Sequence, residues 1–480
     1  MQHQFTKNKM NTWWLLSIAA LLFFVTGILT ETYFLVTIPF VILFFVLFTS
    51  DLRFLYFILL FVIPLSTELS VTSTLSTDMP DEPLMLLLSG SLIAVLLLRP
   101  SLFPNQILKS SLALLLILQF GWMLITVIYS TEMLLSIKYV LAKSWFFIAF
   151  VLGGLLFLKT KEDYKLASKA FIFAMLIPVI GSLVRHAITG FSINSINETL
   201  SPFFRNHVNY SALLVCLLPI LFMWYHFSSG RTRKWTIVII VLFLIALLFA
   251  YSRGAWLCLF TGALTWYAIK KKLLLSFIII AGMIIAIALY WLIQNDNYLK
   301  FAPDFNKTMQ HTNITEHIEA TYELKDISTM ERFYRWIAGF RMANREKLKG
   351  YGPNSFSLHY KEYTVNAFKT WVSSNEEKSS VHNYFLLLAV EQGIPGMILF
   401  VILLFAMFSI AVKAYHTLDD PFDQALAMLC GVILSMIVTL NLLSDLIETD
   451  KIGSLFFIVT GIFIQLQVKL FKRKEMKILN

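Results

Sequence analysis

The stretch LLLSFIIIAGMIIAIALYWLI (273–293) contains 21 residues and no charged side chain. A helix needs about 20 apolar residues to cross the hydrocarbon core of a bilayer. The whole chain of 480 residues is 58% hydrophobic and 14% charged, whereas a soluble protein is about 25% charged. The sequence therefore predicts an all-α polytopic integral membrane bundle, with about 12–14 transmembrane helices.

Further apolar blocks of similar length occur along the chain. Helices are predicted because every backbone polar group must be paired within lipid and the blocks are too long for barrel strands. The expected spans are 11–29, 32–49, 54–70, 83–98, 111–129, 137–158, 166–187, 208–227, 236–251, 254–269, 273–293, 382–411, 424–443 and 452–470. The ninth and tenth blocks are short, and they could instead form a re-entrant pair that enters from one side.

The orientation follows from lysine and arginine in the short connecting segments, which concentrate on the cytoplasmic side. With the N-terminus placed in the cytoplasm, inner segments hold 21 of these residues and short outer segments hold 6. Both termini are therefore predicted to be cytoplasmic, and the loop 294–381 is predicted to be periplasmic. The net charge of +10 is explained by this topology, so membrane lipid is an expected partner and nucleic acid is not.

The long loop, with the start of the span that follows it, gathers basic side chains at one face of the membrane. These residues are Arg332, Arg335, Arg341, Lys347, Lys349 and His382. Such a set could hold a lipid-linked phosphate and move a proton. An enzyme at the outer face has no ATP, so it needs an activated substrate such as a polyprenyl-pyrophosphate sugar.

The loop is expected to contain one amphipathic helix. Residues 328–331 (Ser-Thr-Met-Glu) form a capping box, and the helix is predicted to run to Lys349 and stop at Gly350. Arg332 and Arg335 lie on neighbouring positions of its surface, beside aromatic residues. The helix could bind phosphate or sugar through this edge, or it could rest on lipid headgroups.

Two further arginines are candidates for substrate binding. Arg253 follows Ser252 at the outer turn between two spans, where a guanidinium can bind two phosphate oxygens. The alternative is an arginine that simply reaches for water from a helix end. Arg205 opens a polar and aromatic loop, 205–210, and is a second-rank candidate for phosphate or sugar contacts.

His382 begins the span after the long loop and is the candidate catalytic base. Its imidazole can accept a proton near neutral pH, and Asn383 beside it could orient the ring or a sugar. The alternative is a histidine that only ends the span. Glu391 is expected to brace a helix break at Gly393 and Pro395, and the glycine-rich segment 350–356 is expected to form an ordinary turn rather than an anion site.

No metal site or cofactor is predicted. The nine histidines are scattered, and neither a phosphate-binding Gly-Lys-Ser/Thr loop nor a dinucleotide fingerprint occurs. The three cysteines lie inside apolar stretches and are expected to be packing residues.

Four motifs occur in one order: Ser252-Arg253-Gly254-Ala255, Arg332 with Trp336, Gly350 to Phe356, and His382-Asn383 with Glu391 to Gly396. This arrangement resembles the O-antigen ligase and polymerase family of bacterial envelope glycosyltransferases. The resemblance covers about 205–400. It implies a metal-independent, inverting transferase that takes a glycan from undecaprenyl pyrophosphate at the periplasmic face of the inner membrane. It also implies that His382 is the base and that Arg253 and Arg332 clamp the pyrophosphate.

The resemblance divides the chain into three parts. Residues 1–204 form N-terminal spans, 205–411 form the ligase-like catalytic region, and 412–480 form the last spans and a basic cytoplasmic tail. The acceptor stays open between the lipid A–core of lipopolysaccharide, a growing glycan in a polymerase, and a protein hydroxyl. Outside this class, a lipid-sugar flippase or transporter is the alternative, although such proteins concentrate polar residues at the membrane midplane.

Overall fold

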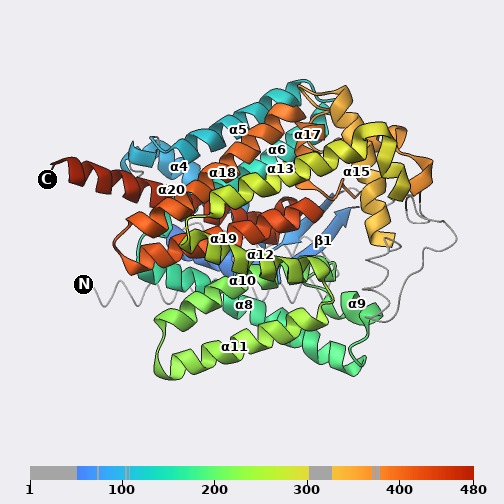
Figure 1. Cartoon of the computed structure of the whole chain (residues 1–480). Coiled ribbons are helices and arrows are strands. Elements are labelled where there is room, and N and C mark those ends of the chain that lie inside the picture. The colour runs from blue at the N-terminus through green and yellow to red at the C-terminus, as the bar shows by residue number, and fades with distance from the viewer. Residues whose placement is uncertain are drawn as a thin grey trace, which may run out of the picture.

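The computed structural model describes residues 51–72, 75–102, 105–107, 109–301, 327–369, 373 and 379–479. The predicted spans 11–29 and 32–49 lie outside these residues. Ten helices in the described part are long and apolar enough to cross a membrane, which confirms an all-α polytopic membrane protein. Most of the molecule is a bundle of helices, and the helices of the long loop, between residues 327 and 369, lie at one end of it (Figure 1).

The long helices cover most of the predicted spans. The ten are α4 (Asp81–Leu98), α5 (Ser111–Ile128), α6 (Met133–Phe146) continued through a π-helical turn (Phe147–Leu152) into α7 (Gly153–Phe157), α8 (Lys161–Ile188), α10 (His207–Phe227), α11 (Gly230–Phe249), α13 (Leu274–Ile293), α18 (Gly393–Thr417), α19 (Pro421–Leu443) and α20 (Asp450–Leu479). Helix α12 (Arg253–Lys270) covers the predicted span 254–269 but is not among these ten. The shorter helices are α3 (Leu52–Val62), α9 (Ile196–Leu200), α15 (Ile327–Arg345), α16 (Phe356–His359) and α17 (Tyr384–Glu391).

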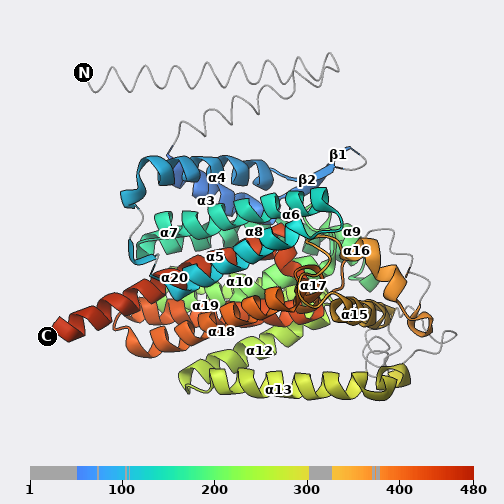
Figure 2. The ribbon, with the colours of Figure 1, turned by 90° about the horizontal axis from the view of Figure 1, so that it is seen from above.

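Burial separates central helices from peripheral ones. Within the most apolar window of each helix, 78% of α20 and 72% of α19 is buried, against 6% of α13. Figure 2 shows α13 along one edge of the bundle and α3 and α4 along the opposite edge. An apolar helix with so little protein around it is suited to contact with lipid tails.

Residues 67–79 form a small hairpin that was not predicted from the sequence. Residues 54–70 were expected to span the membrane, but the helix ends at Val62 and a single 3₁₀ turn follows it. Strand β1 (Thr67–Thr72) then pairs antiparallel with β2 (Leu75–Met79). The prediction was wrong because TELSVT alternates polar and apolar side chains, which is a strand pattern that directly follows an apolar helix.

The expected span 382–411 is two helices, α17 and α18, with a break at Gln392 and Gly393. Gly393 has a φ of +71°, and an added Cβ would meet the backbone of Leu348. The helix of the long loop also ends earlier than predicted, at Arg345 rather than Lys349. The chain from Arg345 to Lys349 therefore packs directly against the break between α17 and α18.

Gly393→Ala should destabilise the protein. The new Cβ would meet the backbone of Leu348, and a non-glycine residue with positive φ costs about 1–3 kcal/mol. We expect a lower midpoint of thermal unfolding in detergent. Gly282→Ala is the matched control, because a Cβ there meets nothing within 4 Å. Equal midpoints for the two variants would contradict the assignment of strain to Gly393.

Candidate functional site

The segment before α17 holds His382 in an unusual backbone conformation. His382 has a φ of +55°, in the left-handed region that non-glycine residues rarely adopt. Its N–H donates to Ser380 Oγ at 3.3 Å, and its carbonyl accepts from Trp336 Nε1 at 3.4 Å. Helix α15 packs against α17, with Gly339 facing Val381 across the contact. These contacts fix the imidazole relative to α15.

Arg335 of α15 makes the closest polar contact to the ring. Its Nη1 lies 2.8 Å from His382 Nε2 and also donates to the carbonyl of Ser380 at 3.2 Å. Its Nη2 is 3.4 Å from the carboxylate of Glu331, one turn earlier. Arg335 is only 6% exposed. A buried guanidinium therefore lies edge to edge with the predicted base.

This contact determines which imidazole nitrogen carries the proton. An arginine nitrogen can only donate, so His382 Nε2 must be the acceptor and Nδ1 must carry the hydrogen. Nδ1 lies 3.8 Å from Asp445 Oδ1. The other carboxylate oxygen of Asp445 accepts a hydrogen bond from the Ser380 hydroxyl. Asp445 thus faces the protonated side of the ring.

The surroundings keep His382 neutral. Burial, and then the charges of Arg335 and Arg332, lower the pKa of His382 from 6.5 to about 3. Burial raises the pKa of the Asp445 carboxyl above its ordinary value. The imidazole therefore holds a lone pair on Nε2 throughout the physiological pH range, but as a weak base.

Arg332 and Arg253 lie toward the same end of the bundle. Arg332 donates its Nε–H to the carbonyl of Leu443, the last residue of α19, at 3.1 Å. Helix α12 runs antiparallel to α19, since Cys258 contacts Met436 and the later Ile269 faces the earlier Gly431. Arg253, the first residue of α12, therefore lies toward the end of α19 that binds Arg332.

Asn383 and Arg205 both take part in contacts within the protein. The Asn383 side chain caps α17 by accepting from Leu386 N at 2.9 Å, and its amide donates to the carbonyl of Leu442, also at 2.9 Å. Arg205 is exposed and forms an ion pair with Glu68 of the hairpin. No described hydrogen bond or ion pair links Arg205 to His382.

Glu391 braces the helix break, as expected. Its carboxylate accepts the backbone N–H of Asn354 at 2.8 Å and of Phe356 at 3.2 Å. The N–H of Gly352 donates to the Glu391 carbonyl at 2.9 Å. The glycine-rich turn therefore directs its backbone donors at the carboxyl oxygens of a side chain of the protein itself.

Sequence reasoning missed three residues of this cluster. Asp445 and Ser380 flank the imidazole, and the carboxylate of Glu331, expected only to cap its helix, accepts from Ser373 and pairs with Arg335. The position of Asp445 between the last two spans places it on the same side as the long loop, and that was an available signal. Nothing in the sequence indicates its contact with Ser380, which is 65 residues away.

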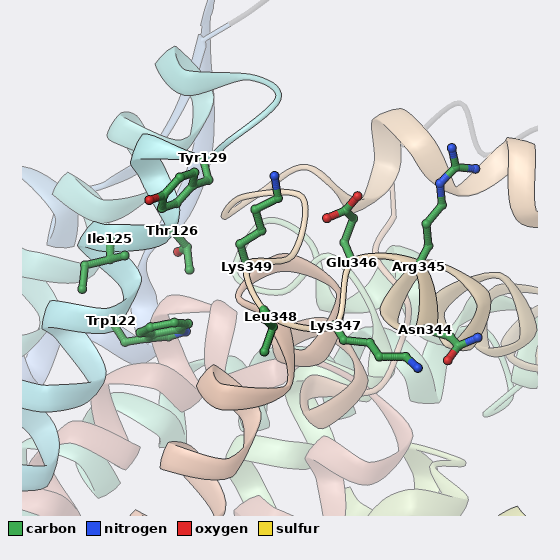
Figure 3. Close-up of a pocket in the computed structure, with 10 residues that line it drawn as sticks. All are labelled: Trp122, Ile125, Thr126, Tyr129, Asn344, Arg345, Glu346, Lys347, Leu348 and Lys349. Carbon is green, nitrogen blue, oxygen red and sulfur yellow. The ribbon is translucent and has the colours of Figure 1, made fainter.

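An open groove of about 700 Å³ lies between the end of α5 and the residues that follow α15 (Figure 3). Trp122 and Tyr129 line one side, and Arg345, Lys347 and Lys349 line the other. The Lys349 ammonium lies 5.7 Å from the centre of the Tyr129 ring. Lys347 and Lys349 belong to the basic set predicted on the long loop, but the groove contains none of the predicted site residues His382, Asn383, Arg205, Arg253, Arg332 and Arg335.

One group of carboxylates among the described residues could hold a cation. Oxygen atoms of Asp78, Glu82 and Asp450 all lie within 4.8 Å of one another. The group was not predicted, and the hydroxyl of Thr77 already donates to Glu82 at 2.5 Å. Its members lie on β2, α4 and α20 and are distinct from the residues around His382.

The ten long apolar helices of the described residues define a polytopic integral membrane protein. Residues 238–401 match the family model described as O-antigen ligase. The match supports an O-antigen ligase-like family for the chain and an O-antigen ligase- or polymerase-type glycosyltransferase activity. It includes Arg253, Arg332, Arg335 and His382, and ends before Asp445. No curated protein matches the sequence.

Glu391→Ala should destabilise the fold, because it leaves the N–H groups of Asn354 and Phe356 without their acceptor. An unsatisfied buried donor costs about 1–3 kcal/mol. We expect a lower midpoint of thermal unfolding in detergent, with Glu391→Gln between the alanine variant and wild type. Exposed Glu475 provides the control, Glu475→Ala, which should unfold like wild type. An unchanged midpoint for Glu391→Ala would refute the bracing role.

Proposed function

We propose that the chain is a glycosyltransferase that moves a glycan from undecaprenyl pyrophosphate to an acceptor hydroxyl. The reaction takes place at the periplasmic face of the bacterial inner membrane. The observation that carries this proposal is the convergence of Arg332, Arg335 and His382 within the O-antigen ligase match. The distribution of lysine and arginine supports cytoplasmic termini and a periplasmic 294–381 loop.

The proposed chemistry is a direct displacement. The acceptor oxygen attacks the anomeric carbon from the face opposite the pyrophosphate, so that the configuration inverts. The carbon–oxygen bond to the pyrophosphate breaks, and its electron pair leaves with the diphosphate. The hydroxyl proton passes to His382 Nε2, and Asp445 stabilises the resulting imidazolium through Nδ1–H.

The arginines supply the charge stabilisation in this scheme. A guanidinium can bind two phosphate oxygens at once, and the leaving diphosphate gains negative charge in the transition state. Arg332 and Arg253 are the proposed clamps, because both lie toward the end of α19 that adjoins the His382 cluster. The step as written requires neither a metal nor a cofactor.

The donor half of this site is common to ligases, polymerases and protein O-oligosaccharyltransferases, which differ in the acceptor. The acceptor presents a hydroxyl group to the base in each case, whether it is lipid A–core, a growing glycan or a protein. Lipid-linked polymer that accumulates in a deletion strain would indicate a ligase. Single unpolymerised units would indicate a polymerase. Transfer by purified protein in detergent, with no membrane to cross, would eliminate a flippase or transporter.

His382→Ala should reduce glycan transfer by about 10²–10⁴-fold, because the acceptor hydroxyl loses its proton acceptor. Transfer is measured with purified protein, a glycan-loaded undecaprenyl pyrophosphate and an acceptor. His359→Gln is the matched control: His359 bonds Thr131 and lies against Tyr351, away from the cluster. The assignment of the base fails if His382→Ala transfers glycan at the wild-type rate.

Arg332→Ala and Arg253→Ala should each weaken donor use by about 10²-fold, the usual effect of removing one group that stabilises developing charge. Lysine at either position should restore activity only in part, since an ammonium cannot bind two oxygens in the same fork. The measurement is kcat/KM for the donor. Full rescue by lysine would show that charge alone is required and would contradict the bidentate contact.

A further inference from the structure

His382 has no lone pair open to an acceptor hydroxyl in this structure. The lone pair on Nε2 is occupied by Arg335 at 2.8 Å, and Nδ1 carries the hydrogen that faces Asp445. A general base must reach the proton that it removes within hydrogen-bond distance. The observed arrangement is therefore a resting state that cannot activate an acceptor.

We propose that Arg335 masks the base and that the donor diphosphate removes the mask. In the resting protein the guanidinium caps His382 Nε2. When the diphosphate of a polyprenyl carrier binds, Arg335 turns toward it, and Nε2 becomes available to the acceptor hydroxyl. This inference rests on the proposed function, because it takes His382 as the base. It gives Arg335 a second role, as a positioning residue for the catalytic histidine.

Arg335 can change partners because its present contacts are incomplete. Its Nη1 divides between His382 and the carbonyl of Ser380, and its Nη2 meets Glu331 only at 3.4 Å. Its Nε has no hydrogen-bond partner among the described residues. A diphosphate carries negative charge and can accept two parallel N–H bonds from one guanidinium, whereas the neutral imidazole accepts one. The phosphate would therefore compete well against a neutral imidazole.

The cluster is also open on the side that a ligand would need. The His382 side chain is 33% exposed, whereas that of Arg335 is 7% exposed. A diphosphate that reaches the partly exposed imidazole would come close to the guanidinium that contacts its Nε2. Arg332, on the preceding turn of the same helix, already acts on His382 through its charge. Two arginines could thus bind one diphosphate.

The contact between Arg335 and His382 also makes the basicity of His382 depend on donor binding. His382 is faced by Arg332 and Arg335 of α15 and by Asp445, and Glu331 lies against Arg335. Beyond Asp445 lie Lys143 and Glu448, which form a 3.0 Å ion pair of their own. Bound diphosphate neutralises the arginine charge that disfavours imidazolium, so the pKa of His382 should rise when the donor is in place. The base then gains strength only when a diphosphate carrier is bound.

The test is an NMR titration of full-length protein in nanodiscs with labelled histidine, using His382→Ala to assign the signal. The ligand is undecaprenyl pyrophosphate without a glycan, and undecaprenol is the lipid control. We expect the diphosphate lipid to raise the pKa of His382 by at least about one pH unit, and undecaprenol to leave it unchanged. If the pKa of His382 does not change when the diphosphate lipid is added, the proposal is overturned.

Arg335→Gln tests the mask without ligand. The variant should show a raised His382 pKa and a smaller further response to the diphosphate lipid, while Arg233→Gln, far from the cluster on α11, should titrate like wild type. If the pKa of His382 in Arg335→Gln equals that of wild type, the proposal that Arg335 masks the base is also overturned. If this variant does not fold, the wild-type titration decides alone. Transfer activity in His382→Ala tests the proposed function separately, since the titration requires no turnover.

Discussion

The contact between a buried guanidinium and an uncharged imidazole governs the electrostatics of this site. Arg335 cannot give up its charge, so His382 must stay neutral and must present Nε2 as an acceptor. Asp445 and Ser380 then fall on the opposite side of the ring, where a hydrogen-bond acceptor suits Nδ1–H. The tautomer of His382 follows from this pair, and its weak basicity follows from burial together with the charges of Arg335 and Arg332.

The fold keeps this pair together through the helix break. Glu391, at the end of α17, accepts two backbone N–H groups from the turn that follows α15. Near the start of α17, Asn383 binds the carbonyl of Leu442 at the end of α19, next to the carbonyl that Arg332 uses. Helices α15, α17 and α19 are therefore joined at both ends of α17. A loop helix outside the spans gains in this way the fixed position that an active-site residue needs.

Sequence alone predicted the features that depend on local composition. The apolar blocks gave the long helices, and the isolated Glu391 correctly indicated a braced break. The β1–β2 hairpin was missed because its alternation follows an apolar stretch closely, and the one break between them, Pro64, was taken as part of a span. The Asp445 contact was missed for a different reason. It joins residues 63 apart in the chain through tertiary packing, and no local pattern records such a pairing.

The segment from Arg332 to Trp336 shows why the spacing of residues predicted where the site lies but not which partner each side chain binds. Three side chains within about one helical turn point to three different partners. Arg332 reaches the end of α19, Arg335 reaches the imidazole nitrogen, and Trp336 holds the His382 carbonyl. The spacing of these residues predicted a cationic and aromatic edge. The position of His382, whose φ is positive, decides that Arg335 contacts the base while Arg332 binds the end of α19. A phosphate that binds both would therefore offset the charge of both arginines near the base, but it would break a hydrogen bond to the imidazole only through Arg335.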